Sequence, residues 1–230
     1  MAEYLVFTLA ASLGAMGDVA GHERRGSWTW PGRSAILGLL GAALGIRRED
    51  AEGQARLNDL SMAVAVFSEG VPLRDYHTVQ TVPTSAAKRP DSRPDAFAKA
   101  GLNINTTITL RDYRAGSVYA VAVWGEGLER LAAALSAPVF TLYLGRKSCP
   151  LSMPPAPRLV ACDTLQKAFA QAALPDYPPA PLRLQMIASD IDLGGGHSDT
   201  RNDQPLDRDK WHFTSRRVHY WRPAADEAPQ

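Results

Sequence analysis

One short segment combines a glycine, two cations and a hydroxyl, groups that often hold phosphate. It reads Leu-Tyr-Leu-Gly-Arg-Lys-Ser over residues 142–148, and a β-prone run precedes its glycine. Successive backbone N–H groups in such a turn form a concavity for anions, to which Arg146 and Lys147 add positive charge. The Lys-Ser pair also occurs in P-loops, but the required upstream glycine is missing and Arg146 separates Gly145 from Lys147. The segment therefore predicts phosphate binding by Gly145, Arg146, Lys147 and Ser148 without nucleotide hydrolysis.

A second anion site is predicted where a helix begins. The sequence Pro-Gly-Arg-Ser over 31–34 precedes an apolar helix over 35–44, with Ser34 as the expected N-cap and Gly45 at the C-terminal end. The N–H groups of a helix N-terminus attract phosphate, and Arg33 adds a cation. Ordinary capping explains the same residues equally well. Phosphate binding by Arg33 and Ser34 therefore depends on the fold bringing them beside the glycine turn.

Charge must act locally in this protein. The chain carries 25 Lys and Arg residues against 24 Asp and Glu, a formal net charge of +1. An overall attraction to nucleic acid is excluded, so any RNA site must come from clustering. Arginine outnumbers lysine, and guanidinium groups suit phosphate oxygens and base faces. The clusters are Arg24 and Arg25 with Arg33, Arg47 with Arg48, Lys88 with Arg89 and Arg93, Arg146 with Lys147, and Arg216 with Arg217. A solvated surface explains any single pair, but positions in turns between strands favour binding.

Metal, disulfide and nucleophile chemistry have little support. Two cysteines, Cys149 and Cys162, are too few for a disulfide framework or a four-ligand zinc site. The acidic loop over 190–199 fails the calcium-binding EF-hand pattern because Gly194 replaces the third ligand, so a solvated loop is the better interpretation. No Ser/His/Asp or Cys/His arrangement has local support. We expect no metal and no cofactor.

Targeting to a membrane is not predicted. The N-terminal residues enter a strand pattern at once, without a basic region followed by an apolar one. The longest apolar run, over 35–46, is too short to cross a bilayer. We therefore expect a cytoplasmic protein.

The first part of the chain alternates strands and helices. Residues 4–10 have the continuous apolar character of a strand buried on both faces, and 61–67 form a second strand. Between them lie a glycine-rich segment over 12–32, the apolar helix described above and a short polar helix over 49–59. A loop as long as 12–32 suggests a binding role.

A protruding hairpin is predicted next. Two β-prone runs, 75–79 and 105–110, flank a polar stretch with several prolines. This pattern predicts a long β-hairpin over about 72–116 with a mobile tip, inserted into the connection between two strands of the sheet. A disordered loop is the alternative interpretation.

The hairpin is followed by a second strand–helix–strand unit. Residues 118–124 form a strong strand, Leu128, Leu131 and Leu135 mark an amphipathic helix, and 138–144 form the next strand. The order strand, helix, strand, insertion, strand, helix, strand is the split β-α-β pattern of ferredoxin-like and RNA-recognition-motif domains. The predicted fold class is α+β, and that fold alone does not specify RNA binding.

Composition changes near residue 150, where prolines become frequent. We place a modified ferredoxin-like domain over 1–150 and a small β-rich C-terminal domain over 151–230. Aromatic residues over 211–221 indicate a small-domain core or a protein interface rather than base stacking. The expected C-terminal elements are a helix over 164–173, a proline-rich linker over 175–181, strands over 182–189 and 211–220, a flexible loop over 190–210 and a disordered tail from 223.

Three motifs together resemble one protein family. Residues 31–46, 75–79 and 143–151 are similar to the first helix, the start of the thumb hairpin and the glycine-rich loop of the CasD family, the CRISPR-associated RAMP-type proteins of type I-E Cascade. The motifs span most of residues 1–151, and their combination is highly specific.

The resemblance implies a non-catalytic subunit of an RNA-guided surveillance complex in antiviral defence. Members bind the repeat-derived 5′ handle of the CRISPR RNA, cap one end of the backbone filament and contact the large subunit. Guide pairing recognises the target, so this chain would contact target DNA mainly indirectly, through the complex. The expected partners are CRISPR RNA and the backbone, large and other Cascade subunits, with no membrane.

The resemblance also assigns roles to residues of this chain. Arg33, Ser34 and the turn over 145–148 would hold handle phosphates, and Tyr76 and His77 would stack on or hydrogen-bond splayed bases. The remaining expected RNA-binding residues are Arg24, Arg25 and, on the hairpin, Lys88, Arg89 and Arg111.

Two alternatives stay open. Relatives in type I-C systems resemble this fold and cleave precursor CRISPR RNA without a metal. Such a metal-independent endoribonuclease needs a base for the 2′-hydroxyl and a group that stabilises the phosphorane, for which Tyr76, His77 and Lys147 have suitable chemistry. The other alternative is a protein-interaction scaffold that touches no RNA, against which the paired cations in turns argue.

Overall fold

Two long apolar strands form the centre of the fold. The computed structural model describes residues 1–20, 23–176 and 181–224. In it β1 (Ala2–Gly14) runs antiparallel to β6 (Asn105–Trp124), and both strands are buried on both faces where residues 5–11 pair with residues 117–123. Phe7 points into one core and Val6 into the other. Because other elements cover both faces of the sheet here, these strands carry few polar side chains. The strand predicted over 4–10 is confirmed as part of β1.

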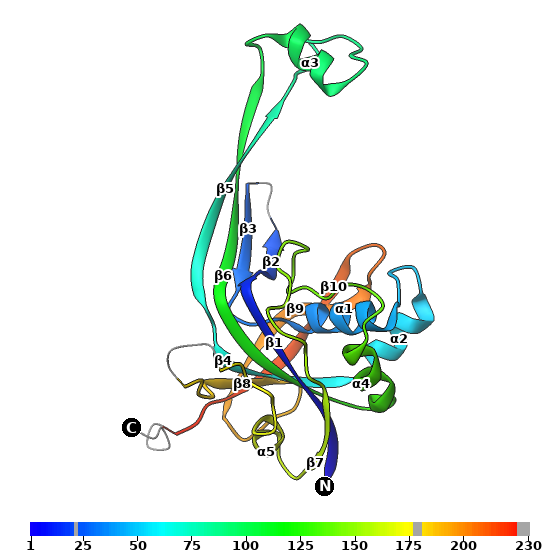
Figure 1. Cartoon of the computed structure of the whole chain (residues 1–230), viewed down its shortest axis with the longest axis vertical. Coiled ribbons are helices and arrows are strands. Elements are labelled where there is room, and N and C mark those ends of the chain that lie inside the picture. Colours follow the sequence, from blue (N-terminus) through cyan, green and yellow to red (C-terminus); the bar gives the residue numbers. More distant parts are fainter. Residues whose placement is uncertain (21–22, 177–180, 225–230) are drawn as a thin grey trace.

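The neighbouring strands and helices complete two layers on the sheet. β4 (Ser61–Ser68) pairs with β6 and β7 (Arg158–Cys162) pairs with β1, both antiparallel, so the local order is β7-β1-β6-β4. On one face of these strands, α1 (Arg33–Leu44) and α4 (Leu128–Ser136) share a core, and α2 (Ala51–Asn58) packs against α1. On the opposite face, α5 (Leu165–Phe169) lies in the second core (Figure 1). The predicted helices are confirmed, with α5 shorter than expected.

The strand predicted over 138–144 is wrong. The backbone N–H groups of Val139 and Phe140 donate to the carbonyls of Ala43 and Ala42, so this segment follows the end of α1 instead of joining the sheet. Gly45 ends α1 with a φ of 76° and leaves terminal carbonyls that need donors. β7, twenty residues further along the chain, takes the place beside β1.

The segment over 12–32 is not a loop. It contains the end of β1 and a small hairpin of β2 (Met16–Ala20) and β3 (Arg24–Trp28). β3 then runs parallel to β6, with Arg24 opposite Leu110 and Arg25 opposite Arg111. This pairing places the Arg24–Arg25 cluster at the base of the protruding hairpin.

The protruding hairpin is present. β5 (Val71–Thr81) pairs with the first half of β6 in unbroken antiparallel register from Val71 opposite Ala115 to Thr81 opposite Asn105. The tip carries a short helix that the sequence analysis does not predict, α3 (Arg93–Ala100), which Ser92 caps by accepting from the Asp95 N–H. Figure 1 shows the ribbon reaching well beyond the rest of the chain.

The C-terminal strands extend the same sheet. β8 (Met186–Ser189) pairs with β4, β10 (His212–Trp221) with β8, and β9 (His197–Asp207) with β10, all antiparallel. The flexible loop predicted over 190–210 is wrong, since most of it is β9. No break in the sheet marks the predicted boundary near 150 in the described residues. Residues 177–180 of the predicted linker and 225–230 of the predicted tail lie outside the described residues.

Candidate nucleic-acid interface

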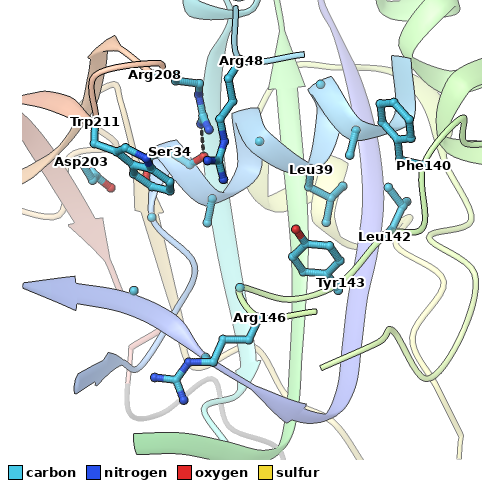
Figure 2. A pocket seen from close by; sticks show the side chains of 18 of the residues that line it. Ser34, Leu39, Arg48, Phe140, Leu142, Tyr143, Arg146, Asp203, Arg208 and Trp211 are labelled. Carbon is cyan, nitrogen blue, oxygen red and sulfur yellow. Dashed lines mark hydrogen bonds between the residues drawn. The ribbon is translucent and has the colours of Figure 1, made fainter. Parts of the chain in front are cut away.

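A cleft of about 720 Å³ lies between α1, the segment over 140–146 and the turn that joins β9 to β10. Figure 2 shows Arg48, Arg208 and Trp211 at one end, Phe140 and Leu142 at the other, and Tyr143 between them. Its lining includes five guanidinium groups and four aromatic rings, from Arg25, Arg47, Arg48, Arg146 and Arg208, and from Phe140, Tyr143, Trp211 and Phe213. The two acidic residues of the lining are Glu49 and Asp203, so cations dominate.

Small residues of α1 let one arginine lie across the helix. A Cβ atom at Gly38 would sit 3.1 Å from Nη1 of Arg208, so glycine makes room for the guanidinium. Nη2 of Arg208 donates to the carbonyl of Ser34, and Nε is buried without a hydrogen-bond partner. Burial, and then the nearby charge of Arg48, lowers the pKa of Arg208. Such a guanidinium is stabilised by an anion.

The glycine turn is fixed against the end of β1. Gly145 has a φ of 87°, and a Cβ atom there would lie 1.6 Å from the carbonyl oxygen of Ala15. The Ala15 N–H donates to the carbonyl of Leu144 at 3.0 Å, which pins the turn. The guanidinium of Arg146 then lies 4.5 Å from the ring centroid of Tyr113, with one Nη2 contact of 3.4 Å to the carbonyl of Arg25. The turn thus directs Arg146 toward the base of the hairpin.

Arg33 is not the phosphate ligand that its position predicts. Its side chain is only 6% exposed, and its guanidinium donates to Asp190 and to the carbonyls of Asn58 and Leu60, each at 2.7 Å. Its backbone N–H donates to Asp203 Oδ2 at 2.7 Å, so a carboxylate of the protein occupies the start of α1. The Asp203 carboxylate is therefore the anion that the positive end of the α1 dipole attracts, in the place where the sequence predicts a phosphate.

The expectation that Ser34 caps α1 is also wrong. Gly32 is the N-cap, where a Cβ atom would collide with the Asp203 carboxylate at 2.3 Å. Ser34 nevertheless lines the cleft, and so do Arg25, Gly145 and Arg146. The fold therefore brings together the start of α1 and the glycine turn, as the sequence predicts, but without the side chain of Arg33.

The other predicted residues are distributed over several places. Lys147 and Ser148 are exposed beyond the turn and are not part of the cleft lining. Lys88 and Arg89 are exposed in the segment that leads to α3 at the hairpin tip, far from α1 in Figure 1. Arg111 lies at the base of the hairpin opposite Arg25.

Tyr76 and His77 leave opposite faces of the ribbon because they are neighbours in one strand. Tyr76 is 68% exposed, and Nδ1 of His77 lies 2.8 Å from Oδ2 of Asp75, on its own face. The two side chains therefore do not contribute to one site, either for stacking a single base or for cutting a single phosphate.

Comparisons with known proteins agree with one another. Residues 4–219 match the family described as CRISPR-associated protein Cas5. The Cascade subunit CasD of Escherichia coli (strain K12) is 33% identical over 223 residues, which cover 90% of each chain. The chain belongs to the Cas5 family, in its CasD branch.

Two solved structures share the fold of this Cas5-family chain over nearly its whole length. One, described as a CRISPR RNA-guided surveillance complex, has a TM-score of 0.70 and 26% identity over 95% of this chain and 89% of that chain. The other, described as the crystal structure of a Cas protein, has a TM-score of 0.68 and 26% identity over 99% and 98% of the two chains. The family expected from the three sequence motifs is confirmed.

Sequence reasoning missed part of the cleft of this Cas5-family chain. Trp211 is 60% exposed, its backbone has a φ of 56°, and the guanidinium carbon of Arg48 lies 4.4 Å from its ring centroid. The sequence predicts a small-domain core or a protein interface for its aromatic run, and not a place in this cleft. Arg208 was hidden in the supposed loop over 190–210. Gly38 marks a close approach to α1, but the sequence alone does not say that Arg208 fills this space.

The described residues contain neither a metal-ligand cluster nor a membrane-spanning helix. Among the described residues, no group of three or more His, Cys, Asp or Glu side chains is arranged to hold a metal ion. Within the same residues, no helix has both the length and the apolar character needed to span a bilayer.

Proposed function

We propose that this chain is a non-catalytic Cascade subunit that binds the 5′ handle of a CRISPR RNA in the arginine-rich cleft. Membership of the Cas5 family and the likeness to CasD support the assignment to Cascade. The observation that carries RNA binding is the cleft itself, whose lining combines arginines with exposed aromatic residues. Single-stranded RNA is recognised by such a combination, with phosphates on arginines and splayed bases on rings.

The proposed subunit also caps the backbone filament and contacts the large subunit, in support of antiviral defence. Target DNA is then reached mainly through the complex. The strand order β7-β1-β6-β4, with α1 and α4 together on one face, supports a modified ferredoxin-like core of the RNA-recognition type. The long β5–β6 ribbon supports the role of a thumb that extends from this core toward neighbouring subunits.

The test of RNA binding removes cations inside and outside the cleft. Complexes are assembled with the Arg146→Ala or Arg208→Ala chain, and their affinity for handle-containing RNA is measured from low to high salt. Arg130→Ala, an exposed position on α4 outside the cleft, is the matched control. Each cleft variant should weaken binding about tenfold or more, since hydrogen bonds to charged groups contribute roughly 1.5–3 kcal/mol. The slope of log K against log salt should fall by about 0.7 for each lost phosphate contact.

Equal affinities for the two cleft variants, the control and the unmodified complex would refute the proposal and favour a protein-interaction scaffold. Co-purification with co-expressed partners, followed by sequencing of the retained RNA, identifies the handle independently.

A second candidate function rests on one contact. The Asp75 carboxylate holds Nδ1 of the exposed His77 at 2.8 Å, the arrangement that orients a general base for a metal-independent endoribonuclease. Incubation of the purified protein with repeat RNA in EDTA tests it. A specific cut that His77→Ala abolishes would establish cleavage, and intact RNA after long incubation would eliminate it.

A further inference from the structure

The protruding ribbon has two chemically different faces at its base. Residues opposite each other in β5 and β6 project from the same face, and successive residues alternate. Arg74, Tyr76 and Thr78 therefore share a face with Asp112, Leu110 and Ile108, their partners in the register. Leu73, Asp75 and His77 share the other face with Tyr113, Arg111 and Thr109. We name these the Tyr76 face and the His77 face.

The cations of the Tyr76 face are already bound by the protein. Nε and Nη2 of Arg24 both donate to Oδ2 of Asp112, at 3.0 and 2.8 Å. Nε and Nη2 of Arg74 donate to Oδ1 and Oδ2 of the same carboxylate, at 2.7 and 3.2 Å. These bonds, from Arg74 first and then from Arg24, hold the pKa of Asp112 down at about 2. Asp112 therefore stays ionised and shared between the two guanidinium groups.

The cations of the His77 face retain unused donors. Arg25 lies opposite Arg111 in the parallel pairing and lines the cleft, while Arg146 rests on the ring of Tyr113. Nε of Arg111 and Nη1 of Arg146 are buried without a hydrogen-bond partner. In the described part of the chain, no ion pair involves any of these three arginines. Asp75, the carboxylate directly opposite Arg111, is engaged by His77.

We propose that the RNA leaves the cleft along the His77 face of the ribbon, over Arg25, Arg146 and Arg111, and that the Tyr76 face does not bind RNA. The proposal rests on the proposed RNA binding and adds its direction. Backbone phosphates engage the donors that the protein leaves open. Arg24 and Arg74 already direct two donors each to Asp112, which offsets part of their charge and holds both guanidinium groups in place. Of the residues predicted from sequence, Arg111 and His77 lie on the RNA path, whereas Arg24 and Tyr76 lie off it.

Two arginines of the ribbon base provide a matched comparison. Arg111→Ala should weaken binding of handle-containing RNA by the assembled complex at least about fivefold, given the usual strength of charged hydrogen bonds. Arg74→Ala removes an equal charge from the opposite face one register position away and should change affinity less than twofold. Equal losses in the two variants, or a larger loss for Arg74→Ala, would overturn the proposal.

Photocrosslinking adds a readout that does not depend on the partly buried Arg111. A benzophenone is attached to Thr107→Cys on the His77 face or to Thr78→Cys on the Tyr76 face, with the unsubstituted chain as a control for the two native cysteines. RNA should crosslink through Thr107→Cys alone. Crosslinks mainly through Thr78→Cys would overturn the path while RNA binding stands. RNA binding itself fails only if Arg146→Ala and Arg208→Ala are also without effect.

Discussion

Replacing Arg33 by methionine should destabilise the fold while leaving RNA affinity nearly unchanged. The variant side chain fills similar space but cannot donate hydrogen bonds. The carbonyls of Asn58 and Leu60 lose their donor, and Asp190 keeps the guanidinium of Arg216 at 2.6 Å but loses that of Arg33 at 2.7 Å. Breaking a buried ion pair by removing one partner costs about 3–5 kcal/mol.

That loss is large against the whole stability of a domain, about 5–15 kcal/mol. For a chain of 150–250 residues, 1 kcal/mol shifts Tm by about 2–4 °C, so Tm should fall by about 6–20 °C. Thermal and urea unfolding of the purified chain, followed by tryptophan fluorescence, measure the change. Arg217→Met, at an exposed position in the same strand as Arg216, is the control and should stay within about 0.5 kcal/mol.

One result would refute this reasoning. If Arg33→Met leaves the free energy of unfolding within about 1 kcal/mol of the original but weakens RNA binding tenfold, the side chain acts on the ligand. The buried ion pair would then contribute little to stability, and the role predicted from the sequence position would be correct.

Three further predictions concern the turn, the ribbon base and the cleft. Gly145→Ala should lower stability more than Gly127→Ala. Both residues have positive φ, but only at Gly145 would a Cβ atom collide with a carbonyl oxygen, at 1.6 Å. Urea unfolding midpoints compare the two variants, and equal midpoints would contradict the packing argument. Asp112→Asn should lower the free energy of unfolding at neutral pH, and the loss should shrink from about pH 4 toward pH 2. The reason is that a carboxylate with a depressed pKa stabilises the fold only while it is ionised. A loss that does not change with pH would contradict this. Trp211→Ala should weaken RNA binding about fivefold or more whereas Trp211→Phe retains most of it, as measured by RNA titration, and an equal loss in both would argue against stacking.

Local patterns predicted the elements whose signals are local. The continuous apolar run of β1, the spacing of Leu128, Leu131 and Leu135 in α4 and the terminal glycine of α1 each determine structure within a few residues, and all three agree with the structure. The paired β-prone runs likewise predicted the ribbon. The family motifs lie in these same regions.

Long-range partners decided the rest. Arg33 looks like a free cation until Asp190 and Asp203, more than 150 positions away in the sequence, are placed beside it. The segment over 138–144 has strand character, but two of its N–H groups donate to carbonyls at the end of α1. Arg208 enters the cleft only because β9 and β10 pair and turn toward α1. These three placements depend on contacts between distant parts of the sequence, so a local sequence pattern does not predict them.

The tie between the first helix and the last strands also constrains how the protein matures during translation. The contact between positions 33 and 203 joins distant parts of the sequence, and such contacts form slowly because a long loop must close first. A nascent chain whose β10 is still inside the ribosome lacks the Arg216 side chain that binds both Asp190 and Asp203. The helix start and the cleft beside it therefore depend on residues near the end of the chain, and a chain that ends before β10 lacks both Arg216 and part of the cleft lining.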